Sequence, residues 1–418
     1  MNYKHFNKLI YFKFNCKFIL LAILIGLTSV FFVKAVDFAF KVFLYLKLIL
    51  GFWIILYIPC MMVFILFLLK NFFPEAEGSG IPQSLAINSL SNNNLNKIFT
   101  LRAIFSKILL IFLGTICGGT LGREGGTVQI GAVFMNQLGK NLNLKRRRML
   151  LIVGAAAGMA SAFNTPIGGI MFAYEELIKS NKYQIGLFKT TAIAISGVVA
   201  ISILGNYSYF GRVERDLLFY NNYIFIISII VGILSGIISG AFTKLVKLLI
   251  IDKNAITQWR DQHFYKNAFF CGIIVALIGI ASNGLSFGNG YNESKMALSG
   301  ELTLPASYAF YKLLGALFTT SSGIPGGYFA TTLAIGNGIG GLVHNFLNLG
   351  NLQQYYLLGM VGFLAALTRA PATSIIMVIQ VSSSQIFTLP LIVTALIATL
   401  TANLFGKNIY QYQIKKYI

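Results

Sequence analysis

Long apolar segments dominate this sequence and restrict what it can fold into. They occupy residues 18–33, 49–69, 223–251 and 385–405. A helix needs roughly 20 mostly apolar residues to cross the hydrocarbon core of a bilayer. Only 11% of the 418 residues are charged, whereas a soluble domain has about 25%. The sequence therefore predicts an all-α, polytopic membrane protein with more than ten helices and no sizeable water-soluble domain.

The charged residues are mostly basic, with 33 lysines and arginines against 12 acids and a formal net charge of +21. The bases cluster near both chain ends and in short loops such as Lys145 to Arg148. We interpret this pattern as the positive-inside bias of a membrane protein and attraction to anionic lipid, not as a nucleic-acid surface. Both termini are then expected in the cytoplasm. The first apolar run is too long for a signal peptide and lacks a clear cleavage site.

The residue types that metal and enzyme chemistry needs are sparse. Four cysteines and three histidines are scattered without the spacing of a zinc site or a disulfide framework, so we expect no metal and no cofactor. An intramembrane protease or lipid-modifying enzyme would need a nucleophile with a base, paired aspartates or a metal triad. The chain has no HExxH motif and no apolar-embedded aspartate to pair with Asp37, which disfavours an enzyme.

Several apolar segments are too short to span a membrane, and each begins with glycine or proline: 80–88, 125–137, 166–176, 326–340 and 371–381. Interrupted helices in both halves of a membrane protein indicate a substrate site near the bilayer midplane. The free N–H groups and positive dipole ends of such helices can hold an anion without a full positive charge. The alternative is that these glycines serve only close helix packing.

Glu124 is the most informative acidic residue, because it directly precedes the glycine pair at 125–126. An ionisable residue at membrane depth is a candidate functional group. Burial opposes ionisation of a glutamate, whereas a helix N-terminus favours it. Glu124 is therefore expected to take up and release a proton, and to occupy the anion's place when it is ionised.

The other embedded charges have plainer interpretations. Asp37 lies one helical turn from Lys34, which predicts a local ion pair at a helix end. Lys107 lies inside an apolar helix expected at about 99–118, where a lysine snorkels or pairs. Glu175 and Glu176 end a short helix and are either a solvated helix end or a functional pair.

Three motifs together resemble the CLC family of chloride channels and chloride/proton exchangers. Residues 78–82 read GSGIP, residues 122–125 read GREG and residues 326–330 read GGYFA. They occur in the family's order, and the resemblance covers nearly the whole membrane part. Gly126 and Thr331 stand where the family has proline at a helix start. We expect these departures to alter kinetics or affinity and not to abolish anion binding.

The resemblance implies the family fold, with two inverted halves per subunit and a homodimer that has one pathway in each subunit. It divides the chain into a basic cytoplasmic segment (1–16), a single transport domain (17–410) and a short basic tail (411–418). The two halves are expected to meet near 206–222. No cytoplasmic CBS domain is expected, and the implied location is a bacterial inner membrane.

The same resemblance assigns roles to individual residues. Glu124 would be the external gate and proton carrier, and Glu176 the internal proton-transfer group with Glu175 beside it. The resemblance also implies that chloride is held by the hydroxyls of Ser79 and Tyr410 and by the amides of Phe329 and Ala330. The free helix starts add Gly80, Ile81 and Gly125 as candidate chloride-binding residues.

The function implied is exchange of chloride for protons across the membrane. Family exchangers generally keep both glutamates, and this chain has Glu124 and Glu176. Ser79 favours chloride, because nitrate-preferring relatives tend to have proline there and the fluoride-exporting branch departs from GSGIP. The alternative is a passive chloride channel gated by voltage or protons.

Overall fold

The computed structural model of this chain describes residues 3–178, 186–205, 210–211, 213 and 222–417, with the backbone alone for residues 3–11. Within these residues the chain is helical, and extended segments pair only at an isolated antiparallel bridge between Gly122 and Gly327. The all-α prediction is confirmed. Most of the boundary expected near 206–222 lies outside the described residues.

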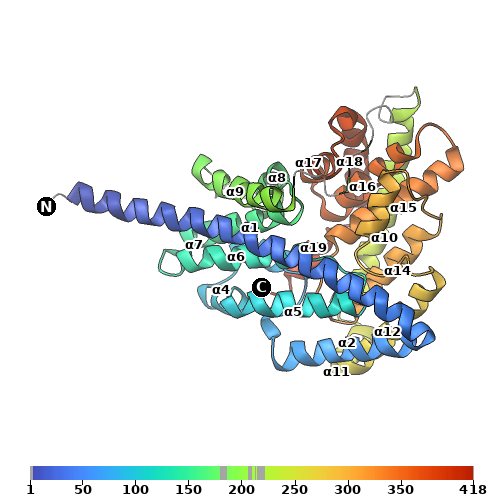
Figure 1. Ribbon diagram of the computed structural model, residues 1–418, viewed down its shortest axis with the longest axis horizontal. Helices are drawn as coiled ribbons and strands as arrows, with labels where there is room; N and C mark the ends of the chain where they lie inside the picture. Colours follow the sequence, from blue (N-terminus) through green and yellow to red (C-terminus); the bar gives the residue numbers. More distant parts are fainter. Residues whose placement is uncertain (1–2, 179–185, 206–209, 212, 214–221, 418) are drawn as a thin grey trace.

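The helices of the first half are α1 (Tyr3–Leu50), η1 (Gly51–Trp53), α2 (Ile54–Asn71), η2 (Pro74–Ala76), α3 (Ile81–Leu85), η3 (Ala86–Asn88), α4 (Asn92–Ile98), α5 (Leu101–Ile116), α6 (Glu124–Gly139), α7 (Leu144–Ala162), α8 (Pro166–Phe172), η4 (Ala173–Leu177) and α9 (Leu187–Leu204). Here η4 is a π-helical turn that continues α8. Figure 1 shows α1 running along the length of the molecule, with its N-terminal end projecting beyond the other helices.

The helices of the second half are α10 (Ile224–Val246), η6 (Lys247–Ile251), α11 (Ala255–Gln262), α12 (Phe264–Ala281), α13 (Tyr291–Leu298), α14 (Tyr308–Ser321), α15 (Phe329–Leu347), α16 (Leu352–Thr368), α17 (Pro371–Ser382), η7 (Gln385–Phe387), α18 (Thr388–Asn403) and α19 (Ile409–Ile414). In Figure 1 most of these helices, yellow-green to red, lie on the side of the molecule away from the projecting end of α1, whereas α19 lies near its middle.

The first spanning segment differs from its predicted bounds. The apolar runs at 18–33 and 49–69 are separate in the sequence, but α1 continues unbroken past the first of them to Leu50. The residues between 37 and 50 include no glycine or proline that would stop a helix. The chain turns only at Gly51, whose φ is +50°.

Five of the described helical segments are long and apolar enough to cross a membrane, or six if the bent pair α4–α5 counts as one span. Most remaining helices are shorter, as the glycine and proline starts predicted. Broken helices at membrane depth must be covered by protein, and α6, α7, α15 and α16, which are not among these spans, are almost entirely buried. The chain is a multi-pass membrane protein built from long and broken helices.

The second half repeats the packing of the first. A Cβ placed on Gly131 would lie 2.1 Å from the carbonyl oxygen of Gly154, and one placed on Gly336 would lie 2.3 Å from that of Gly359. Only glycine allows backbones to approach so closely. Gly131 and Gly336 are separated by the same number of residues as Gly154 and Gly359. We call this the repeat spacing; it relates α6–α7 to α15–α16.

Candidate functional site

Three helices begin at one place inside the protein: α3, α6 and α15. The segments leading into α6 and α15 are joined by two hydrogen bonds, from the N–H of Gly122 to the carbonyl of Gly327 (2.8 Å) and the reverse (2.9 Å). The loop before α3 touches α6, because a Cβ on Gly125 would lie 2.3 Å from the Ser79 carbonyl oxygen. The three glycine-rich motifs therefore converge, as a shared anion site requires.

Glu124 is the first residue of α6 and is fully buried. Its Oε2 accepts a hydrogen bond of 3.4 Å from the N–H of Ala330 at the start of α15. Oε1 has no hydrogen-bond partner among the described residues. The Thr127 hydroxyl donates to the Glu124 carbonyl at 2.6 Å and steadies the first turn. A carboxylate thus lies against a backbone amide that the family resemblance assigns to the anion.

Arg123 joins the start of α6 to α1. Its guanidinium is buried and its Nη1 donates to Asp37 Oδ1 at 2.6 Å and to the Val33 carbonyl at 3.1 Å. The local ion pair expected between Asp37 and Lys34 at a helix end is wrong, because α1 continues past Asp37 and Arg123 supplies the partner. Arg123 therefore anchors the loop before α6 to α1.

The loop before α3 is held by buried polar side chains. Lys107 on α5 is completely buried and donates to the carbonyls of Gly78 (2.6 Å) and Glu77 (3.4 Å). Of the two interpretations of Lys107, snorkelling is wrong, because its ammonium turns inward to these carbonyls. Gln83 Oε1 accepts the N–H of Gly80 at 2.9 Å. These bonds fix the backbone that leads to Ser79.

The two hydroxyls predicted for the site are both buried. Ser79 Oγ accepts a hydrogen bond of 3.3 Å from the N–H of Ile81 at the start of α3. Tyr410 lies on α19, which packs against α3. Its hydroxyl has no hydrogen-bond partner among the described residues, and the charges of Glu176 and Glu124 both act on it. Tyr410 is therefore within electrostatic reach of both predicted glutamates.

The remaining predicted anion-site residues also lie at these helix starts. Gly80 precedes α3 with a φ of +107°, a conformation that favours glycine. Phe329 and Ala330 open α15 and are buried. The ring of Phe329 packs on that of Phe163, with centroids 5.4 Å apart. The structure thus brings together all the residues assigned to the anion site.

The second pair of glutamates lies in the π-helical turn η4. π-helical turns often occur at functional sites. Glu176 is only 2% exposed, so its interpretation as a solvated helix end is wrong. Glu175 reaches the other half of the molecule, where its Oε1 accepts the N–H of Ala372 (3.1 Å) and its Oε2 that of Thr373 (2.6 Å). Glu175 therefore caps α17.

Gln380 belongs to no motif and was not among the predicted residues. Its Oε1 accepts a hydrogen bond of 2.9 Å from the N–H of Gly168, in the first turn of α8. Gln380 follows Glu175 at the repeat spacing. That spacing is the signal that would have revealed it, because it pairs each residue of one half with a counterpart in the other.

A cavity of about 630 Å³ lies next to Ser79 and Tyr328. It is bounded by α2, α11, α12, the end of η6 and the C-terminal segment. Basic side chains around it outnumber acidic ones: Lys70, Lys247, Lys253, Arg260, Lys415 and Lys416 against Glu77, Asp252 and Asp261. A basic cavity raises the local concentration of anions.

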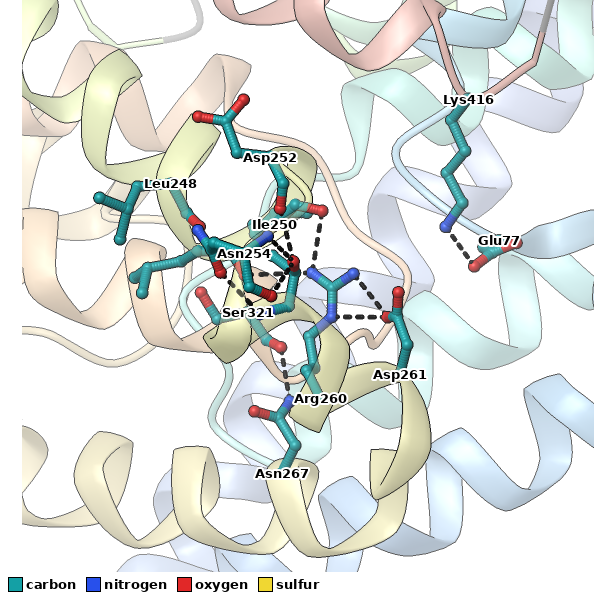
Figure 2. A network of polar contacts seen from close by, with 12 residues as sticks. Glu77, Leu248, Ile250, Asp252, Asn254, Arg260, Asp261, Asn267, Ser321 and Lys416 are labelled. Atoms are coloured by element: carbon teal, nitrogen blue, oxygen red, sulfur yellow. Dashed lines mark hydrogen bonds and ion pairs between the residues drawn. The ribbon is translucent and has the colours of Figure 1, made fainter.

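Figure 2 shows two polar clusters on the walls of this cavity. In one, Arg260 pairs with Asp261 at 2.8 Å and donates to the Ile250 carbonyl at 3.0 Å. In the other, Lys416 Nζ pairs with Glu77 Oε1 at 2.7 Å. The second pair ties the C-terminal segment to the loop before α3.

We predict that acid loosens this C-terminal contact. Burial alone raises the pKa of Glu77, but Lys416, Lys70 and Lys107 outweigh it and hold the pKa below its ordinary value of 4.5. The stabilisation is then fully present above the ordinary pKa and is lost as pH falls through the lowered one. Hydrogen exchange in 409–417, corrected for intrinsic rates, should stay constant from about pH 7 to pH 5 and rise below about pH 4.

The matched variant for this prediction is Glu77→Gln. It should show the faster exchange of the C-terminal segment already at neutral pH, because the ion pair with Lys416 is absent. Equal protection in the variant and the unmodified protein would show that the pair does not hold the segment.

The donors that converge at the three helix starts are backbone amides and hydroxyls, which bind anions. No group of three or more histidine, cysteine, aspartate or glutamate side chains is placed to hold a metal ion in the described part of the chain. The Glu124 carboxylate lies among these donors, hydrogen-bonded to the Ala330 amide.

Known proteins share this architecture. The family model for voltage gated chloride channels matches residues 60–403. The solved structure of a slow cyanobacterial Cl⁻/H⁺ antiporter aligns with a TM-score of 0.81 at 23% identity and covers 96% of this chain and 97% of that one. A CLC-type fluoride/proton antiporter gives 0.79 at 20% identity and 99% coverage of both chains. A eukaryotic CLC transporter gives 0.73 at 19% identity, with 96% of this chain and 74% of that one.

The structural matches establish the fold, and the family model covers most of the sequence. Both agree with the broken helices and the convergent helix starts described above. This chain belongs to the voltage-gated chloride channel (CLC) family.

Proposed function

We propose that this protein is a secondary active transporter that exchanges chloride for protons. The observation that carries the proposal is the buried Glu124 carboxylate, which rests on the Ala330 amide at the start of α15. A carboxylate in an anion site competes with the transported anion. Protonation removes its charge and frees the amide for chloride, so that anion binding is linked to a proton.

The chloride ion would be held by neutral donors. These are the amides at the starts of α3, α6 and α15 together with the hydroxyls of Ser79 and Tyr410. The Tyr410 hydroxyl is buried and has no hydrogen-bond partner among the described residues, which leaves it available to an anion. Neutral donors suit transport, because an ion that is bound too tightly cannot leave.

Protons would reach Glu124 through Glu176. This role is supported by the burial of Glu176 and by the Tyr410 hydroxyl, on which the charges of both glutamates act. With both termini on the cytoplasmic side, Glu176 would serve the cytoplasm and Glu124 the opposite face. Two such subunits would form a homodimer with separate pathways in a bacterial inner membrane.

The decisive experiment uses purified protein in liposomes with an outward chloride gradient and the membrane potential held near zero. Exchange predicts that protons enter against their gradient while chloride leaves. Chloride flux without proton movement would overturn the proposal and identify a passive channel. Fluoride in place of chloride tests the halide, because one structural neighbour is a fluoride/proton antiporter; the GSGIP sequence at 78–82 favours chloride.

Glu176→Gln should uncouple the two ions. Glutamine keeps the size of the buried side chain but cannot carry a proton, so proton flux should fall by about 100-fold. Chloride flux should persist, since the helix starts that hold the anion are untouched. Proton and chloride fluxes measured on the same liposomes give the coupling ratio. An unchanged ratio would exclude Glu176 from the proton route.

A further inference from the structure

The helices α8 and α17 cap each other across the two halves of the chain. Glu175 accepts the N–H groups of Ala372 (3.1 Å) and Thr373 (2.6 Å) at the start of α17. Gln380, within α17, accepts the N–H of Gly168 (2.9 Å) at the start of α8. Each helix thus satisfies donors in the first turn of the other, where the helix itself supplies no acceptor.

The two caps are counterparts in the repeat. Gln380 follows Glu175 at the repeat spacing, and Thr373 follows Gly168 at the same spacing. The same backbone position is therefore capped by the same side-chain position in both halves. One half uses a carboxylate and the other an amide, so only their chemistry differs.

The packing at these caps leaves little room for other arrangements. A Cβ on Gly168 would lie 2.9 Å from Met377 Cγ, and one on Gly169 would lie 2.5 Å from Ala160 Cβ. Gly168 and Gly169 are both buried. A buried N–H that loses its acceptor is strongly unfavourable, so the loss of either cap should displace α8 relative to α17.

The segment that the caps fix is the one that carries Glu176. α8 continues directly into the π-helical turn η4, which contains Glu175 and Glu176. Gln380 holds the beginning of this segment at Gly168, and Glu175 holds its end against α17. The position of Glu176 therefore depends on contacts made by the opposite half.

We propose that Glu175 and Gln380 are positioning residues that hold the α8–η4 segment and thereby place Glu176 for proton transfer. Gln380 would then set the efficiency of proton coupling, although it belongs to the second half and carries no charge. This inference rests on the proposed exchange of chloride for protons. The inference goes beyond that proposal, because it makes the efficiency of proton coupling depend on a residue outside the three glycine-rich motifs.

The test compares Gln380→Met with Gln380→Glu. Methionine has a similar length but offers no oxygen to the Gly168 amide, whereas glutamate keeps one. The matched control is Asn143→Ala, which removes another side-chain cap, that of α7 on Arg146, in a helix other than α8 and α17. Each protein is reconstituted, and proton and chloride fluxes are measured together.

In Gln380→Met we expect the proton flux per chloride to fall about threefold to tenfold, the effect of losing one positioning hydrogen bond. Gln380→Glu and Asn143→Ala should keep the coupling ratio of the unmodified protein. A ratio unchanged in Gln380→Met would overturn the inference. So would an equal fall in Asn143→Ala, since a general loss of stability would then suffice.

A second readout keeps the inference testable apart from transport. Hydrogen exchange in residues 166–178 should be faster in Gln380→Met than in Gln380→Glu. Unchanged exchange would show that Gln380 does not hold the α8–η4 segment. Should Gln380→Met fail to fold, Glu175→Gln, which keeps one acceptor oxygen, should give the same signs in weaker form. Absence of proton uptake by the unmodified protein would instead overturn the proposed function. Hydrogen exchange in 166–178 would then still decide whether Gln380 holds the α8–η4 segment.

Discussion

Glu124→Gln should abolish proton movement and leave chloride transport in place. The carboxamide keeps the volume of the buried side chain and an oxygen that can accept the Ala330 N–H, now bonded at 3.4 Å. It cannot bind and release a proton, so proton flux should fall by at least about 100-fold. Because the neutral side chain competes less strongly with an anion, chloride flux should persist. Simultaneous recording of both ions in liposomes checks this.

Glu301→Gln is a matched control for this experiment. It makes the same chemical change at an exposed carboxylate that belongs to none of the converging helix starts, so coupling should be retained. If Glu124→Gln still pumps protons against their gradient when driven by chloride, Glu124 is not the proton carrier. Loss of chloride flux in Glu124→Gln would show instead that the carboxylate is needed to hold the helix starts together.

The parts of the site that could be predicted are those set by short stretches of backbone. A glycine pair or a glycine–proline start dictates where a helix begins, and this property needs no distant partner. The motifs at 78–82, 122–125 and 326–330 therefore located the starts of α3, α6 and α15 within a few residues. Their convergence followed from the family resemblance, since nothing local says that three helix ends meet.

The parts that could not be predicted depend on partners far apart in the sequence. Asp37 had a basic neighbour one turn away, but the buried guanidinium of Arg123 outweighs Lys34 because it has no access to water. Lys107 lies in an apolar run that suggests snorkelling, yet its ammonium donates hydrogen bonds to carbonyls of the loop before α3. In both cases the tertiary partner decides the contact.

The cap from Gln380 was missed for a different reason. A glutamine in an apolar helix has no distinctive local pattern, and its importance is visible only through its repeat counterpart Glu175. The repeat spacing is present in the sequence, but few of the residue pairs separated by it are identical. Close glycine contacts, which the structure places at equivalent positions, were needed to fix the register.

Gly80→Ala should eliminate transport of both ions. A Cβ at this position would lie 2.0 Å from the carbonyl oxygen of Gly125 and 3.1 Å from the Gln129 side chain. Cβ atoms essentially never approach within 3.0 Å of another heavy atom, so α3 and α6 would have to separate where the helix starts converge. A displacement of about 1 Å costs a preorganised site about 100-fold in rate.

The control for this variant separates steric clash from backbone strain. Gly51 also has a positive φ, +50°, but nothing lies within 4 Å of a Cβ placed there. Both alanine variants therefore carry left-handed strain of about 1–3 kcal/mol, and only Gly80→Ala adds the collision. Chloride flux should be retained in Gly51→Ala and lost in Gly80→Ala, with monodispersity on size exclusion and helical circular dichroism confirming that both fold. Equal flux in the two variants would mean that α3 and α6 can part without harm, and that the anion site does not depend on their contact.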